Sequence, residues 1–129
     1  MSKKRELIFK WILFAENDLK VAQILFDENN FQFYQIIIFH TQQAVEKMIK
    51  AFMINHDIAF KKIHNLNKLL SMIEHIEGFE VGAYDYIDIF NKFSVEVRYP
   101  DMEEIPTKED CIIAIDMTYK IFNIFKPQI

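Results

Sequence analysis

Helical periodicity between residues 34 and 52 constrains the fold of this chain more than any other feature. Apolar side chains recur there at steps of three and four, which places them on one wide face of a helix. They are Tyr34, Ile37, Ala44, Val45, Met48, Ala51 and Phe52, with Thr41 filling the gap. A face this wide needs neighbours on several sides, so the stretch predicts a long helix inside a helical bundle.

Four other segments carry the same period, and few residues interrupt it. The 129-residue chain is 51% hydrophobic and has only two glycines and three prolines, which leaves little room for hairpin turns. We expect an all-α, up-and-down bundle of about five helices in one domain spanning residues 1–129. The expected helices cover about residues 4–27, 31–55, 65–78, 81–97 and 107–126.

The expected helix ends rest on capping residues. Asn65 is a suitable N-cap for the third helix, and Gly78 is expected to end it. Thr107 and Asp110 have the spacing of a capping box at the start of the fifth helix, with Asp in the Glu position. The segment 81–97 is predicted to be one helix.

A polar row flanks the apolar face of the second helix. His40, Gln43, Lys47 and Lys50 recur at steps of three and four, with Glu46 beside them. Such a row of donors could bind a phosphate or a nucleotide, and it could equally be a solvated helix flank.

Asp18 interrupts an otherwise apolar stripe on the first helix, and a partly buried carboxylate needs a partner. Because the first two helices are expected to be antiparallel neighbours, Lys47 or Lys50 is the obvious candidate. We therefore predict a structural ion pair between Asp18 and Lys47; a ligand-facing carboxylate is the alternative.

Two further residues lie in expected loops. His64 follows Lys61 and Lys62, and it could point at the same cleft or cap the third helix. Arg98 could clamp an anion through its guanidinium, or bind nearby helix-end carbonyls or carboxylates.

Composition argues against several classes of protein. The net charge of −4 gives no general attraction for nucleic acid. The four histidines, at 40, 56, 64 and 75, lack metal-site spacing, and phosphate-loop and dinucleotide motifs are absent, so we expect no metal and no cofactor. Cys111 cannot form an internal disulfide, and no apolar run approaches the ~20 residues that span a bilayer. These features predict a cytoplasmic protein.

Four motifs, in order, resemble the HEPN domain family (higher eukaryotes and prokaryotes nucleotide-binding). They are Ala15, Asp18, Leu19 and Ala22; Gln43-Ala44-Val45-Glu46-Lys47 with Lys50-Ala51; His64 with Leu66; and Arg98-Tyr99-Pro100-Asp101. The resemblance covers nearly the whole chain and implies a helical bundle that forms a homodimer.

Many HEPN proteins are ribonucleases marked by an arginine followed, four to six residues later, by a histidine. After Arg98 the corresponding positions hold Glu103, Glu104 and Ile105, and after Arg5 they hold Lys10, Trp11 and Ile12. Acids at those positions would repel the scissile phosphate instead of polarising it. The chain therefore resembles the non-nucleolytic branch, whose members are commonly encoded beside a minimal nucleotidyltransferase.

The sequence thus predicts a non-catalytic, homodimeric module without catalytic residues. It would bind a nucleotide-like anion, assist a separate nucleotidyltransferase in a toxin–antitoxin-like pair, or both. The candidate ligand-binding residues are His40, Gln43, Lys47, Lys50, His64 and Arg98. Two alternatives remain: a divergent ribonuclease toxin using His40 or His64 with Arg98, and a structural dimer with no ligand.

Overall fold

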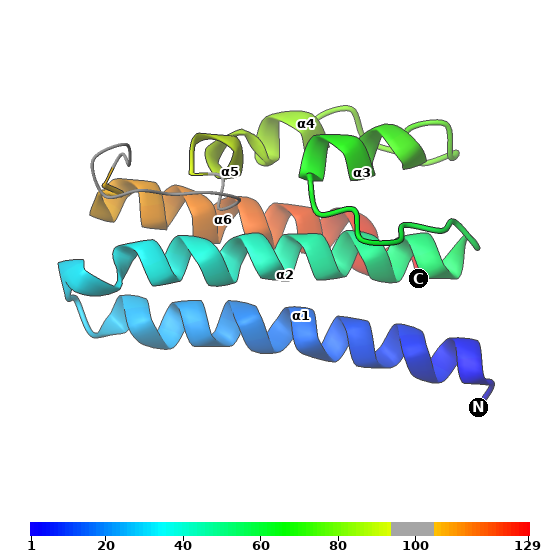
Figure 1. Ribbon diagram of the computed structural model, residues 1–129, viewed down its shortest axis with the longest axis horizontal. Helices are drawn as coiled ribbons and strands as arrows, with labels where there is room; N and C mark the ends of the chain where they lie inside the picture. Colours follow the sequence, from blue (N-terminus) through cyan, green and yellow to red (C-terminus); the bar gives the residue numbers. More distant parts are fainter. Residues whose placement is uncertain (94–104) are drawn as a thin grey trace.

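A computed structural model describes residues 1–93 and 105–129, and in those residues every regular element is a helix (Figure 1). The prediction of an all-α bundle is confirmed. The α-helices are α1 (Lys3–Asp27), α2 (Tyr34–Asn55), α3 (Leu66–Ile73), α4 (Ala83–Tyr86), α5 (Asp88–Lys92) and α6 (Lys108–Phe125), with single 3-10 turns at Phe31–Phe33 and Lys126–Gln128.

The two longest helices, α1 and α2, run antiparallel and side by side, and α6 packs against α2 (Figure 1). The tight reversal between α1 and α2 is made by two asparagines. Asn29 adopts the left-handed conformation, with φ of 52°, which asparagine tolerates better than most residues. Asn30 then caps the following turn, because its side chain accepts a hydrogen bond from the backbone N–H of Gln32.

Helix α2 supplies the centre of the core, as its periodicity predicts. Ala44, Val45, Met48 and Phe52 are fully buried, and the Phe52 ring meets Phe125 of α6 at 5.0 Å between centroids. Edge-to-face aromatic pairs of this kind add to the free energy gained by burial alone. The apolar face of α2 therefore packs against both α1 and α6, while its flank carries the polar row.

Two of the expected helices are shorter than predicted. The third ends at Ile73, and turns fill the chain up to Gly78, whose φ of 90° suits glycine. The fourth breaks at Ile87, with φ of −93° and ψ of −3°, into α4 and α5. Ala83 and Phe93, on either side of the break, are both buried, whereas on one straight helix they would point about 80° apart. Val97, the expected last core residue of that segment, lies outside the described residues.

Both predicted caps are present. The Asn65 side chain accepts a hydrogen bond from the backbone N–H of Lys68 at 2.9 Å. Thr107 and Asp110 bond reciprocally, at 3.1 and 2.9 Å, as a capping box does. Of the helices in the described part of the chain, none combines the length and the apolar character needed to cross a bilayer.

Candidate functional site

Two compact polar clusters lie where the polar row of α2 meets its neighbours, and each is built around one carboxylate. We call them together the α1–α2 seam; it comprises Asp18 with His40 and Lys47, and Glu46 with Lys50 and His64. The row predicted as a single set of donors is therefore divided into two sets, each already occupied by an acid.

In the first cluster, Asp18 of α1 reaches across to α2. Its Oδ2 accepts a hydrogen bond from Lys47 Nζ at 2.5 Å, and its Oδ1 lies 3.0 Å from His40 Nδ1. Because an ionised carboxylate only accepts, His40 Nδ1 must carry the proton. The Asp18 side chain is 14% exposed, so this bridge is partly shielded from water. The structure thus forms the contact between Asp18 and Lys47 that the helical pattern predicts.

The second cluster is more deeply buried. Glu46 and Lys50, one helical turn apart on α2, are 5% and 3% exposed, and their side chains are joined at 2.9 Å. The same Glu46 oxygen lies 2.9 Å from His64 Nδ1. A buried carboxylate with a lysine and an imidazole has its charge compensated locally, which burial of an ion requires.

The connecting segment, residues 56–65 between α2 and α3, encloses this second cluster. Its Phe60 ring packs edge-on against Trp11 of α1, with centroids 5.5 Å apart. The Lys50 ammonium lies 5.1 Å from the Phe60 ring and 5.8 Å from the Trp11 ring, within the range of a cation–π interaction. Lys50 is therefore held by one acid and two aromatic faces, and a solvent-borne phosphate has no direct path to it.

Of the remaining candidate residues, Gln43 is half-buried on α2, and Arg98 lies outside the described residues. Sequence reasoning mentioned Glu46 only as a neighbour of the row and missed its central role. The spacing of four between Glu46 and Lys50 was the available signal.

Across residues 1–93 and 105–129, no group of three or more His, Cys, Asp or Glu side chains is arranged to hold a metal ion.

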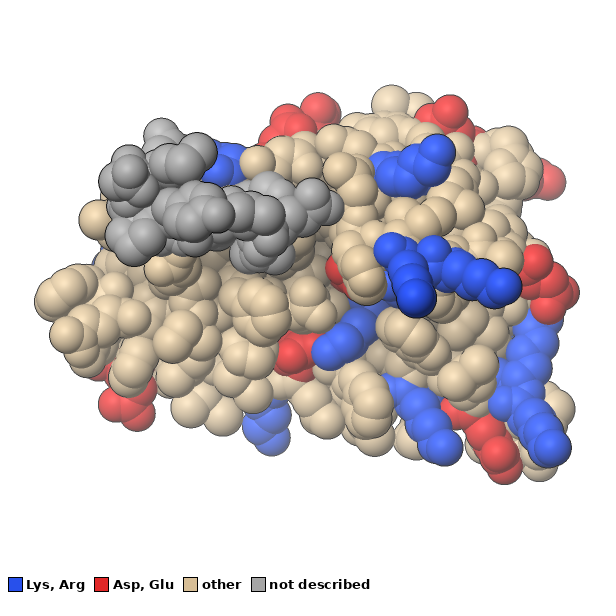
Figure 2. Space-filling view, viewed as in Figure 1, with Lys and Arg blue, Asp and Glu red and all other residues tan. Residues whose placement is uncertain are grey.

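Exposed cations gather on the face that carries the seam. Figure 2 shows Lys and Arg side chains concentrated in the right half of this face, over the first half of α1 and the connecting segment, with acids mostly toward its edges. The exposed lysines of these elements and of α3 are Lys3, Lys4, Lys10, Lys61, Lys62 and Lys68. Of these, Lys4 pairs with Asp57 at 3.1 Å.

The exposed cations of this face thus come from one end of the molecule and from the connecting segment, while Lys47 and Lys50 of α2 are paired. His64 belongs to both groups, because its Nδ1 faces Glu46 while the side chain remains 65% exposed. Its Nε2 is left as an accepting nitrogen when Nδ1 carries the proton.

The fold and these clusters define a class: an all-helical module in which Asp18 joins the first two helices and Glu46 centres a second, buried cluster on α2. The profile of the HEPN domain matches residues 8–128. The chain belongs to the HEPN domain family.

Two solved structures and one curated protein are similar to this chain. The chain is similar in fold to an archaeal HEPN homologue, ST0689, with a TM-score of 0.72 and 23% identity over 94% of this chain and 96% of that one. It is also similar to TT1696 from Thermus thermophilus, with a TM-score of 0.78 and 20% identity over the full length of both. At these identities the two structures bear on the fold alone.

The curated relative is a protein of Methanocaldococcus jannaschii named "Putative toxin MJ1304". It is 34% identical over 83 residues, covering 51% of this chain and 53% of the relative. The chain therefore spans about half the length of the curated relative that it matches.

Proposed function

We propose that this chain is a non-catalytic, homodimeric HEPN module of the non-nucleolytic branch. It holds a nucleotide-like anion on its basic face and assists a separately encoded nucleotidyltransferase as one half of a toxin–antitoxin-like pair. Membership of the HEPN family supports the module, and the name of the relative, "Putative toxin MJ1304", supports the toxin–antitoxin setting.

The observation that carries the proposal is the division between paired and exposed cations. Lys47 and Lys50 are neutralised by Asp18 and Glu46, so they act as scaffold. Lys61 and Lys62 are exposed beside His64 on the connecting segment, and basic side chains gather over that segment (Figure 2). This arrangement suits reversible, charge-assisted binding of phosphate, which weakens as salt rises. The predicted anion site is thereby moved from α2 to the connecting segment.

The test is nucleotide and RNA binding by a pair of charge-matched double variants. Calorimetry with ATP and with a short single-stranded RNA would compare Lys61→Met/Lys62→Met with the control Lys20→Met/Lys120→Met. We expect the first variant to lose about tenfold in affinity, equivalent to about 1.4 kcal/mol, and the control to retain it. Absence of binding by the parent protein, or equal losses in both variants, would contradict the proposal.

The outward face of α1 supports the dimer. Leu7, Phe14 and Val21 follow one another at steps of seven and are 46%, 54% and 38% exposed. Exposed apolar side chains aligned in this way mark an interaction surface, and a two-fold dimer would bury them against their own copies. Sedimentation should show a dimer for the parent protein and a monomer for Phe14→Asp; a monomeric parent at tens of micromolar, a concentration chosen on the order of weak-interface affinities, would exclude this part of the proposal.

A second candidate, a divergent ribonuclease toxin, is favoured by one feature. Glu46 bonds His64 through Nδ1 while the His64 side chain remains 65% exposed, which is how a carboxylate prepares an imidazole for proton transfer. Incubation of clean protein with labelled single-stranded RNA separates the candidates. The non-catalytic proposal expects no cleavage above background. Cleavage that disappears in both His64→Ala and Arg98→Ala would establish the ribonuclease instead.

A further inference from the structure

A groove runs between α1 and α6. Both helices pack on α2, and the groove consists of three hollows of about 390, 520 and 300 Å³, the last of them lined by α1 and the C-terminal turn that follows α6. Neighbouring hollows are linked through shared or bonded residues: Lys126 lines two of them, and Gln23 of the first bonds Tyr119 of the second. We call this surface the α1–α6 groove.

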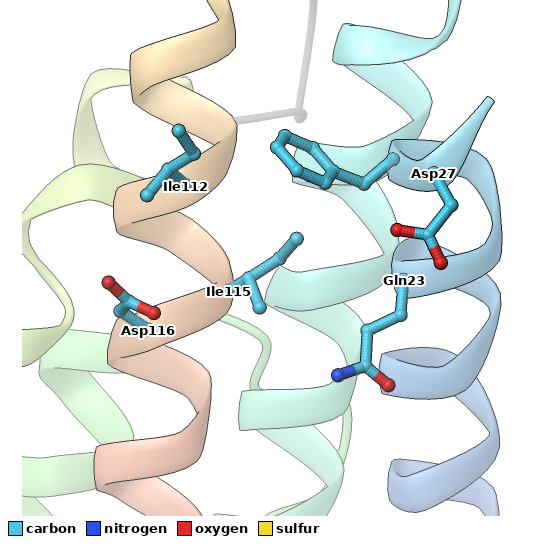
Figure 3. A pocket seen from close by; sticks show the side chains of 6 residues that line it. Gln23, Asp27, Ile112, Ile115 and Asp116 are labelled. Atoms are coloured by element: carbon cyan, nitrogen blue, oxygen red, sulfur yellow. The ribbon is translucent and has the colours of Figure 1, made fainter. Parts of the chain in front are cut away.

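The floor of the first hollow is apolar, and its rim is acidic. Phe26 of α1 and Ile112 and Ile115 of α6 supply the apolar side chains, and Ile115 points toward α1 (Figure 3). Asp27 and Asp116 line the hollow from opposite helices, and both are exposed. Within residues 1–93 and 105–129, neither carboxylate has a hydrogen bond or an ion pair.

This combination selects the chemistry of the occupant. Two uncompensated carboxylates repel phosphate, so the hollow cannot extend the anion-binding face. An arginine or lysine side chain fits, because its stem covers apolar surface while its charged head reaches the carboxylates. Charge complementarity of this kind guides a partner into one orientation.

The remaining hollows define the other end of the occupant. The third hollow is lined by Arg5 and Lys126 together with apolar Phe9 and Ile12. The groove thus has an acidic end, whose carboxylates are unpaired within the described residues, and apolar side chains along it, while Lys126 at its other end is paired with Glu16. Two contacts cross it, Gln23 with Tyr119 and Lys126 with Glu16, the latter at 2.6 Å. Both use surface side chains, so an incoming segment can displace them at small cost.

We propose that the α1–α6 groove is the docking site for an amphipathic helix of the partner protein, with basic residues at the Asp27–Asp116 end. A helix lying along α6, which has 18 residues, would span about 27 Å. The inference deepens the proposed function, since it gives the module a place for its partner. It rests on that function only in requiring a protein partner, and its test uses neither nucleotide nor RNA.

The probes are two synthetic helical peptides of about 18 residues. Both peptides carry the same apolar face. At the end that would meet Asp27 and Asp116, one peptide has Lys and Arg and the other has Glu. Binding is measured by fluorescence anisotropy at low salt and mapped by methyl NMR on the full chain. The basic peptide should bind and shift the methyl signals of Ile112 and Ile115. Equal binding of both peptides, or shifts confined to other isoleucines, would overturn the proposal.

Charge-matched variants sharpen the test. Asp27→Asn/Asp116→Asn should weaken binding of the basic peptide about tenfold. The control Glu77→Gln/Asp85→Asn removes two exposed acids elsewhere and should leave binding unchanged. Equal losses would reduce the effect to net charge and reject the site. A change from dimer to monomer in the groove variant would assign the groove to self-association, which also rejects a separate partner.

Discussion

Helix α1 carries an acid in each of two grooves, and the two acids are in opposite states. Asp18 faces α2 in the α1–α2 seam, where Lys47 and His40 bind both of its oxygens. Asp27 borders the α1–α6 groove, where no cation reaches it from the described residues. The compensation of a charge, more than its presence, therefore separates scaffold from binding surface. The ion pairs of the seam stabilise the fold, whereas the acids of the groove, unpaired among the described residues, can bind a partner.

The largest expected difference is in cysteine reactivity between the core side and the groove side of α6. Burial, with a smaller contribution from the neighbouring Asp110 carboxylate, raises the pKa of the Cys111 thiol to about 12. A group with a raised pKa keeps its proton in the folded state, so its contribution to stability holds below the ordinary thiol pKa and is lost as the pH rises toward 12. At pH 8 the thiolate fraction is about a thousandfold below that of an exposed cysteine.

In an Asp116→Cys variant, the new cysteine on the groove side should therefore react with a thiol reagent about a thousandfold faster than Cys111. Mass spectrometry of the two labelled peptides from one sample gives both rates, and denaturant should make them equal. Comparable labelling rates in the native protein would mean that the core side of α6 is accessible to solvent.

Within the seam, the more buried Glu46 cluster should contribute more to the free energy of unfolding than the Asp18 cluster. Lys50→Met keeps most of the aliphatic stem but leaves Glu46 buried with only His64 as a partner. We expect a loss of about 3 kcal/mol in the free energy of unfolding, because removing one member of a buried pair strands the other charge. Urea denaturation measures the change. Lys20→Met, at an exposed position on α1, is the control and should stay within about 0.5 kcal/mol; a similar value for Lys50→Met would make the cluster dispensable.

The Asp18 cluster allows the most direct comparison of the two grooves. Asp18→Asn should lower the free energy of unfolding by about 1 kcal/mol, less than Lys50→Met because Asp18, His40 and Lys47 are partly exposed. Asp27→Asn makes the same chemical change on the same helix and should leave stability unchanged. The difference should narrow at high salt, where screening weakens exposed pairs. The screening length falls roughly threefold between about 0.1 and 1 M salt. If the stability difference between the two variants is the same at both concentrations, its origin is not electrostatic.

Much of this arrangement could be predicted from the sequence, because local spacing encodes it. Spacing within one helix predicts the apolar period of α2 and the caps at Asn65 and Thr107. The contact of Asp18 with Lys47 follows from the antiparallel packing of two helices that are consecutive in the chain. The bond between Glu46 and His64 could not be predicted, since it depends on the path of the connecting segment. The break at Ile87 also escaped prediction, because apolar spacing alone does not distinguish one helix from two short ones that share a buried face.

The α1–α6 groove was missed for a related reason. Asp27 and Asp116 lie 89 positions apart, and each looks like an ordinary solvated acid on its own helix. Only the packing of both helices on α2 brings them to one hollow (Figure 3). Sequence reasoning finds sites that share an element, and sites formed between distant elements need the fold.

The smallest expected effect tests how the seam is closed. His64→Ala removes the one hydrogen bond from the connecting segment to Glu46 that the described residues show, yet leaves the bond between Glu46 and Lys50 intact. Because the His64 side chain is 65% exposed, we expect a loss of only about 0.5 kcal/mol in global stability. Local opening should respond more strongly, since stability varies across a structure. Amide exchange should accelerate in residues 56–65 and stay unchanged in α2. Uniform acceleration would show that His64 supports the whole bundle, and no acceleration would show that Phe60 on Trp11 holds the segment without it.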